Sequence, residues 1–476
     1  MIKNYSYIPQ NQRKKILLIC DDIRAHSGVG NVAKEIIFHT SHVYNWVNIA
    51  GAKEHPDKNK RLDLSQEINK INKLEDSYLI LYPTDGYGNS KFLRQVLELE
   101  KPDVIMLITD PRYFTWLFNM ENEIRKTTPI IYLNIWDNFP APYYNKPYYE
   151  SCDLLLGISK QTKLINELVL GDKAKDKIIS YLPHGVDEDK FKPIDKDSLE
   201  FKKFKKQILP KGSDFVVFHN SRNIRRKQTS DTILAFKLFL DTLPLEKAKR
   251  CHLIMHTEIV SPAGTNILEV IRVLMGDKYK EQIVLSHKKL SQEQLNFLYN
   301  IADAQILISS NEGWGLSLTE AILAGTPIIA NVTGGMQDQM GFEDENGEWY
   351  TPSSEVPSNH RATYISCGDW AFPVFPSSIS IQGSPATPYI YDDRCDVNHV
   401  VKQLKRVYLM DRQEREDRGK RGREWALSDR IGFTSRHQGL RFIDNVNKLF
   451  EEWKPRERYE LINTKPTSHT ILNHKL

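Results

Sequence analysis

The chain has 476 residues, of which 40% are hydrophobic and 26% are charged, and its formal net charge is +4 at pH 7. This composition is that of a soluble globular protein, and no apolar run approaches the about 18 residues that a membrane-spanning helix needs. The length predicts two domains with room for a third, smaller unit, and the small positive charge allows a polyanionic partner without requiring one.

The N-terminus is polar and has no apolar core of the kind found in secretion signals. The five cysteines, at positions 20, 152, 251, 367 and 395, show no paired spacing that would indicate a metal site. We therefore expect a reducing, cytoplasmic location.

The first part of the chain predicts a doubly wound parallel sheet. The apolar run KILLIC at 15–20 precedes the turn-like HSGVGN and a stretch with apolar residues at helical spacing, which together indicate strand, glycine loop and helix. Further strands are predicted at 78–82, 103–108, 129–133 and 153–158, with helical or polar stretches between them. This pattern predicts a Rossmann-like domain over residues 1–195.

The same alternation then begins again. PHGVDEDKF at 183–191 is interpreted as a structural turn, and the lysine-rich FKKFKKQILPKGSD at 201–214 as a solvated linker. Four strands follow at 214–220, 251–257, 281–287 and 304–310, with helices at 229–242, 292–301 and 317–324. They predict a second Rossmann-like domain over 196–429. Because ligands bind at the carboxyl ends of such strands, the two domains should face each other across a binding cleft.

The remaining segments break this pattern. Residues 341–393 are rich in Pro, Ser and Gly with little periodicity, so we expect a loop-rich insertion. Charged helices resume near 396. A C-terminal helix at about 430–455 is expected to pack back on the first domain, and 456–476 is expected to be a tail.

The stretch SSNEGWGLSLTEAILAGTP at 309–327 places two acids around a turn. Glu312 follows the predicted strand, and Glu320 lies about one turn inside the next helix. The amides near Gly313 and Gly315, with the helix N-terminus, would favour a phosphate or a sugar hydroxyl. Both acids can therefore reach one ligand from opposite sides.

The pattern of Glu312, seven residues, Glu320 and then Ala-x-x-Ala-Gly-Thr-Pro resembles the signature of retaining GT-B glycosyltransferases of the family 4 (glycosyl transferases group 1) type. The resemblance implies that Glu320 binds the ribose hydroxyls of a nucleotide-sugar donor, expected to be a UDP-sugar, and that Glu312 lies at the sugar. It implies donor contacts from the segment that comprises Gly313, Trp314, Gly315 and Leu316. No other cofactor and no metal is expected.

A second motif, HNSRNIRRKQTSD at 219–231, resembles the family's diphosphate-binding loop, which implies that Arg222 and Lys227 hold the donor diphosphate. Arg225 and Arg226 are expected to be solvated.

The first domain adds two family elements. Gly28 and Gly30 match the N-terminal glycine loop, which approaches the donor from that domain. Trp136 stands where family members carry a histidine of a His-Asp-like pair near the sugar: either the register is shifted by a few residues or the sugar is contacted differently, so no catalytic histidine is assigned. Asp137 and Glu312 are the expected catalytic residues.

The acceptor side should be the first domain, whose segments 109–118 and 136–151 are unusually aromatic. Their aromatic side chains, with Arg112 and Lys146, could stack a sugar ring, a lipid headgroup or a base turned out of a duplex. A base turned out of a duplex would stack on Tyr143, Tyr144 or Trp136.

Residues 20–24 and 109–118 are similar to glycosyltransferases of tailed bacteriophages, some of which modify hydroxymethylated cytosine in DNA. Double-stranded DNA with hydroxymethylated bases is therefore the preferred acceptor. The alternative is a cell-envelope, lipid or soluble saccharide acceptor. An alternative of another class is a non-catalytic protein that binds a nucleotide sugar or a nucleic acid.

Overall fold

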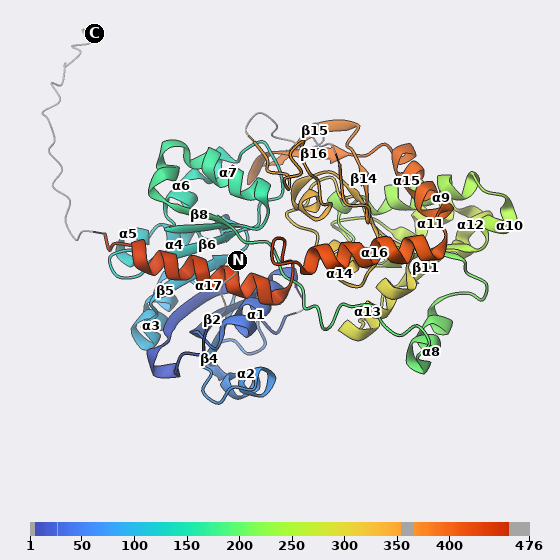
Figure 1. The fold of residues 1–476 in the computed structure, drawn as a ribbon. Coiled ribbons are helices and arrows are strands. Elements are labelled where there is room, and N and C mark those ends of the chain that lie inside the picture. Colours follow the sequence, from blue (N-terminus) through green and yellow to red (C-terminus); the bar gives the residue numbers. More distant parts are fainter. Residues whose placement is uncertain (1–4, 26, 354–365, 457–476) are drawn as a thin grey trace, which may run out of the picture.

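The computed structural model of the protein describes residues 5–25, 27–353 and 366–456 (Figure 1). It contains two α/β domains, each built on a sheet of parallel strands with helices on its faces, and these domains lie side by side (Figure 1). The predicted fold class is therefore confirmed. Of the expected tail at 456–476, only Arg456 lies within the described residues.

Within the described residues, the sheet of the first domain has eight strands in the order β3-β4-β2-β1-β5-β6-β7-β8, and only the short edge strand β3 is antiparallel to its neighbour. The strands are β1 (Lys14–Asp21), β2 (Tyr44–Ala52), β3 (Leu62–Asp63), β4 (Leu79–Asp85), β5 (Val104–Ile108), β6 (Ile130–Asn134), β7 (Leu154–Gly157) and β8 (Ile178–Tyr181). The helices are α1 (Gly28–Thr40), α2 (Ser65–Asn72), α3 (Ser90–Glu100), α4 (Thr115–Phe118), α5 (Glu121–Ile124), α6 (Lys146–Glu150) and α7 (Lys160–Leu170). All residues of β5 and β6 are buried, as expected for parallel strands covered on both faces.

The second sheet is entirely parallel, with six strands among the described residues in the order β11-β10-β9-β12-β13-β14. The strands are β9 (Phe215–Asn220), β10 (Cys251–His256), β11 (Ile283–Ser286), β12 (Ala304–Leu307), β13 (Ile328–Asn331) and β14 (Ala371–Val374). The helices of this domain are α8 (Leu199–Ile208), α9 (Thr229–Asp241), α10 (Leu245–Ala248), α11 (Ile267–Leu274), α12 (Gly276–Tyr279), α13 (Gln292–Ile301), α14 (Leu316–Leu323), α15 (Val397–Leu409) and α16 (Arg412–Leu427). The last helix, α17 (Ser435–Glu452), lies on the first domain.

The lysine-rich segment at 201–214 was wrongly predicted as a solvated linker. Most of it belongs to α8, and the rings of Phe201 and Phe204 are buried against Phe297 of α13 with centroids 5.8 and 5.4 Å apart. Residues three apart lie on one face of a helix. The two phenylalanines therefore bury one face while the lysines occupy the others.

The insertion at 341–393 is more ordered than predicted. Its described part contains the edge strand β14 and an antiparallel hairpin formed by β15 (Ser378–Ser384) and β16 (Thr387–Arg394). Figure 1 shows this hairpin at the junction of the two domains. Residues 354–365 of the predicted insertion lie outside the described part of the chain.

The chain ends against the first domain. After α16 it crosses over, and α17 packs on α1 and β2, where Phe442 stacks on Trp46 with ring centroids 5.7 Å apart (Figure 1). Gly439 of α17 allows this approach, because a Cβ there would lie 2.7 Å from the Cβ of His39. No helix in the described ranges is both long and apolar enough to cross a bilayer.

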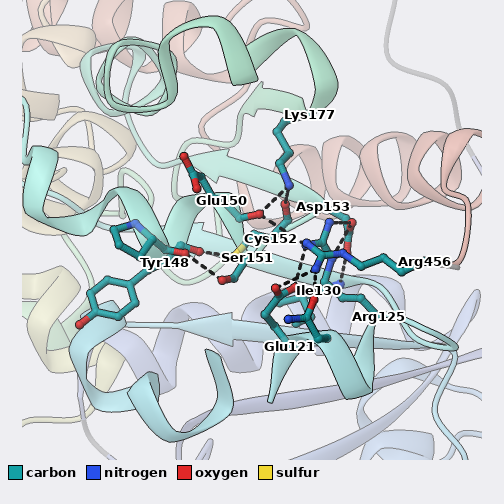
Figure 2. Close-up of polar contacts among 12 residues, drawn as sticks. Glu121, Arg125, Ile130, Tyr148, Glu150, Ser151, Cys152, Asp153, Lys177 and Arg456 are labelled. Carbon is teal, nitrogen blue, oxygen red and sulfur yellow. Dashed lines mark hydrogen bonds and ion pairs between the residues drawn. The ribbon is translucent and has the colours of Figure 1, made fainter. Parts of the chain in front are cut away.

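A cluster of ion pairs then fixes the end of the described chain (Figure 2). Arg125 lies between Glu121 and Asp153, at 2.9 and 2.6 Å, and its side chain is only 8% exposed. Arg456 follows α17 and contacts Glu121 at 2.8 Å. This cluster attaches the C-terminal segment to the edge of the first domain.

Candidate active site

A cavity of about 800 Å³, called here the interdomain cavity, lies between the two domains. Its walls include the loops that follow β6, β9 and β12, so it is bordered by the carboxyl ends of strands from both sheets, as expected for α/β domains. The residues predicted from the sequence that line it are Gly28, Asp137, Arg222, Lys227, Glu312, Gly313, Trp314, Gly315, Leu316 and Glu320. The fold therefore brings residues that were predicted from segments far apart in the chain to one cavity.

The glycine loop predicted around Gly28 and Gly30 is instead the first turn of α1. Ser27 is the N-cap, and its hydroxyl accepts a hydrogen bond from the Gly30 amide at 2.9 Å. Gly30 does not line the interdomain cavity; a Cβ there would lie 3.0 Å from the Asp22 carbonyl oxygen, so its role is close packing. Gly28 has open space beside it and lines the cavity.

Glu312 is held by two cations. Its carboxylate accepts hydrogen bonds from Arg226 at 3.0 Å and from Lys227, and its side chain is only 10% exposed. Burial alone would raise the pKa of this carboxyl, but the charges of Arg226 and Lys227 outweigh it and lower the pKa to about 2. Glu312 is therefore an anion at any physiological pH.

The prediction that Arg226 is solvated was wrong. Its guanidinium lies between two acids, one from each domain: it is 3.0 Å from Glu312 and 3.7 Å from Asp137. The neighbouring Arg225 is exposed, as predicted. The spacing of the motif did not distinguish these adjacent arginines, because only the fold determines which one faces the first domain.

Asp137 comes from the loop after β6 and faces Glu312 across the domain boundary. Burial raises its pKa, and the attraction of Arg226 does not reverse this shift. A Cβ on Gly313 would lie 2.8 Å from the carbonyl oxygen of Ile135 and 3.1 Å from Asp137 Oδ1. Glycine at 313 therefore allows the loop of one domain to approach the acid of the other.

Glu320 lies on α14 and borders the interdomain cavity. The hydroxyl of Tyr299 donates a hydrogen bond to its carboxylate at 2.5 Å. Burial raises the pKa of Glu320 to about 7, although the hydrogen bond from Tyr299 opposes the shift. Tyr299 therefore positions the carboxylate, which can accept further hydrogen bonds from a ligand.

Two residues that were predicted to contact the donor, Arg222 and Trp314, lie outside the group of charged side chains around Glu312. The Arg222 side chain is 78% exposed at the rim of the cavity, 3.9 Å from Glu258. The Trp314 indole is buried, and its N–H donates to Thr319 Oγ1 at 2.9 Å. Arg222 is thus a solvent-exposed cation at the rim, whereas Trp314 is packed in the interior.

His184 was missed, because PHGVDEDKF was interpreted as structural. Its ring lines the interdomain cavity 6.3 Å from that of Trp314, and among the described residues its Nδ1 has no hydrogen-bond partner. Burial lowers the pKa of His184 to about 4, so the ring is neutral at pH 7. Nothing in the sequence around this single histidine indicates that it lines a cavity.

A second cavity, of about 430 Å³, adjoins the first and is called here the hairpin cavity. It shares Ile135, Asp137 and Arg226 with the interdomain cavity. Its other walls come from the first domain, including Arg112 and Trp136, from the β15–β16 hairpin, and from Arg225 and Asn311 of the second domain.

The remaining aromatic and basic residues predicted for the acceptor do not line either cavity. Tyr143 is exposed, the Tyr144 hydroxyl donates to the carbonyl oxygen of Tyr389 at 3.2 Å, and Lys146 lies 3.9 Å from Glu150. Of the residues predicted to contact the acceptor, Arg112 and Trp136 therefore line the hairpin cavity, and Tyr143, Tyr144 and Lys146 do not.

Metal ligands do not gather in the described ranges: no group of three or more His, Cys, Asp or Glu side chains there could hold an ion. The charged groups that could hold a diphosphate are the cations of the 222–227 loop. Independence from metals stays a prediction.

Comparisons with known proteins bear on the family and on the fold. Residues 200–359 match the family model described as Glycosyl transferases group 1. Mannosylfructose-phosphate synthase of Agrobacterium fabrum is 25% identical over 191 residues, which cover 40% of this chain and 39% of that protein. The chain thus aligns with well under half the length of that curated relative. The family match supports the predicted transferase enzyme.

Solved structures match nearly the whole chain. Sucrose-phosphate synthase from Thermosynechococcus elongatus has a TM-score of 0.63 at 15% identity, and the match covers 92% of this chain and 100% of that one. The E. coli structure described as trehalose-6-phosphate bound with UDP-2-fluoro glucose has a TM-score of 0.64 at 12% identity, with 93% and 100% coverage. At these identities the likeness shows the fold, which is GT-B.

Proposed function

We propose that the protein is a glycosyltransferase that moves a sugar, with retention of configuration, from a nucleotide-sugar donor to a hydroxyl of a saccharide acceptor. The observation that carries the proposal is the meeting of Asp137, Arg226 and Glu312 at the junction of two adjoining cavities. Both cavities are bordered by both domains, and the hairpin cavity also has a wall from the β15–β16 hairpin. This arrangement suits two substrates that react at a shared point.

The donor would occupy the interdomain cavity, and a UDP-sugar is the proposed donor. Its ribose hydroxyls would donate hydrogen bonds to Glu320, while Lys227 and Arg222 would approach the diphosphate with the amides at Gly313 and Gly315. The UDP sugar in the matched E. coli structure supports this choice.

Transfer forms a bond between the acceptor oxygen and the anomeric carbon and breaks the bond from that carbon to the diphosphate oxygen. The acceptor proton passes to the departing diphosphate, so atoms and charge balance. Arg226 and Lys227 would offset the negative charge that grows on the leaving group. Glu312 is held as an anion at the reacting centre, and Asp137 faces it from the acceptor side.

The saccharide acceptor is better supported than DNA. The curated relative and one matched structure are named as synthases of phosphorylated sugars. Of the side chains predicted to contact a duplex, Arg112 is paired with Asp110 and hydrogen-bonded to Thr387, and Trp136 is 9% exposed with its N–H bonded to Asn138. These groups are engaged inside the protein.

The non-catalytic alternative is less favoured by the same geometry. Arg226 and Lys227 are two partly desolvated cations held against one carboxylate, a charged arrangement that costs free energy to bury. A protein that only binds a ligand has little physical need for it beside a second acid, Asp137.

The direct test is to incubate the protein with nucleotide sugars that differ in base and in sugar, with and without small saccharides, and to measure release of nucleoside diphosphate. We expect release from one donor class, accelerated by a saccharide and accompanied by a product whose mass equals acceptor plus sugar. Binding of a donor without any release would instead support the non-catalytic alternative.

A further inference from the structure

The β15–β16 hairpin belongs to the second domain by sequence, but it is hydrogen-bonded to the first. The amide of Tyr391 donates to the carbonyl oxygen of Phe139 at 2.6 Å. The hydroxyl of Tyr389 donates to the carbonyl oxygen of Ala141 at 3.2 Å, and the Tyr144 hydroxyl donates to the carbonyl oxygen of Tyr389 at the same distance. The hairpin is thus attached to the surface of the first domain, although the rest of its sequence neighbours belong to the second.

The base of the hairpin is also fixed to the second domain. The Asp393 amide donates to the carbonyl oxygen of Ser310 at 2.8 Å, and Arg394 pairs with Asp231 at 2.9 Å. These contacts set the hairpin across the domain boundary, so its position does not depend on one domain alone.

The tip of the hairpin closes over the acceptor side of the first domain. Arg112 Nη1 donates to Thr387 Oγ1 at 2.6 Å and to the carbonyl oxygen of Ala386. Gln382, Ser384 and Thr387 line the hairpin cavity opposite Asp110 and Arg112. The cavity therefore exists because the insertion supplies one of its walls.

This cavity meets the donor site at the reacting groups. Asp137 and Arg226 line both cavities, and Asp137 lies toward the first domain. A hydroxyl entering from the hairpin cavity would reach the anomeric carbon of a sugar held beside Glu312. The amide group of Gln382 and the hydroxyl of Ser384 line this cavity and suit a ligand rich in hydroxyls.

We propose that the hairpin cavity is the acceptor site and that the hairpin tip limits the acceptor to a molecule of mono- or disaccharide size. This inference rests on the proposed function and names its substrate class. A volume of about 430 Å³ lies in the lower part of the roughly 300–1,000 Å³ range of small-molecule sites. A mono- or disaccharide fits this volume, and in the proposal the further units of a long glycan, or a duplex, would have to pass the hairpin tip.

The test uses two matched variants of one strand. Ser384→Trp fills the hairpin cavity, whereas Ser378→Trp places the same residue at an exposed position of β15 that does not line it. Transfer from UDP-glucose to glucose, fructose and maltose is measured beside donor hydrolysis without acceptor. We expect Ser384→Trp to raise the acceptor KM by about tenfold or more, with donor hydrolysis and the Ser378→Trp variant unchanged.

A second variant separates size selection from simple loss of a contact. Residues 383–389 are replaced by an Asn-Gly turn that joins the paired residues Gln382 and Ile390, which shortens the tip and keeps the contacts of Tyr391, Asp393 and Arg394. We expect this variant, unlike the wild type, to use maltotetraose. Equal transfer by the wild type to maltose and maltotetraose, an unchanged KM in Ser384→Trp, or hydrolysis with no transfer to any mono- or disaccharide would each overturn the inference. Failure of the proposed function itself is distinct, because the wild type would then release no nucleoside diphosphate from any nucleotide sugar.

Discussion

Asp137 and Glu312, which belong to different domains, lie on either side of one guanidinium, that of Arg226, at 3.7 and 3.0 Å. Their environments shift their pKa values in opposite directions: the pKa of Glu312 falls to about 2 beside its two cations, and burial raises that of Asp137. Acids whose pKa values are driven apart in this way take different roles in catalysis. The contact between the domains therefore creates the candidate site.

Replacing Arg226 by methionine should slow sugar transfer by about 100-fold or more, because one group that offsets charge on the leaving diphosphate is lost. It should also raise the pKa of Glu312. Initial rates at saturating donor measure the effect. Arg250→Met is the control, since Arg250 is exposed and pairs with Asp214 at the amino end of β9. Equal rates for both variants would remove Arg226 from the reaction.

Replacing Glu320 by glutamine should weaken donor binding by about 1.5–3 kcal/mol, because hydrogen bonds from the ribose hydroxyls to a charged acceptor become neutral ones. Calorimetric titration of the wild type and the variant with UDP checks this. An unchanged Kd would place the ribose elsewhere.

The pH dependence of donor affinity should report the same carboxyl. Because burial raises the pKa of free Glu320 to about 7, much of it is protonated at mildly acidic pH and cannot accept two ribose hydrogen bonds. Donor binding favours the carboxylate, so wild-type affinity should rise from about pH 6 to about pH 8 and then level off. Glu320→Gln should lack this rise, and an identical pH profile in the variant would contradict the assignment.

Treatment with EDTA should leave transfer unchanged, since Arg226 and Lys227 supply the positive charge that a divalent ion supplies in other transferases. No cluster of metal-ligand side chains occurs in the described part of the chain. Rates are compared before and after chelation and after addition of magnesium or manganese. Loss of turnover that either ion restores would show that the two cations are insufficient.

The Arg125 cluster of Figure 2 should contribute to stability rather than to catalysis. Arg125→Ala leaves Asp153, whose side chain is 8% exposed, without its partner and should reduce the free energy of unfolding by about 3–5 kcal/mol. Arg94→Ala breaks the exposed pair with Glu123 and should cost about 0–1 kcal/mol. Denaturant titration compares the two, and equal losses would contradict the role of burial.

The strands that were predicted from the sequence are those with uninterrupted apolar runs, such as KILLIC in β1 and VIMLI in β5. β2 was missed because Asn45, Asn48 and Gly51 interrupt its apolar residues, although Asn48 is buried and donates to the carbonyl oxygen of Leu18 at 3.2 Å. The hairpin was missed because Gly383, Pro385 and Pro388 hide the alternation of its strands.

For the site, the strand, glycine turn, helix and Ala-Gly-Thr-Pro context around Glu312 and Glu320, with the family resemblance, predicted two acids at one cavity, and both line the interdomain cavity. The positions of Arg226 and His184 could not be predicted in this way, because each depends on how closely the domains approach. Local sequence carries no measure of that distance.

The measurement that tests the account most directly offers the wild-type protein a radiolabelled UDP-sugar together with a disaccharide and a duplex that contains hydroxymethylcytosine, and follows where the label goes. The account predicts label on the disaccharide, in the anomeric configuration of the donor, and none above background on DNA or in Glu312→Gln. Label on the duplex with none on the disaccharide would contradict it.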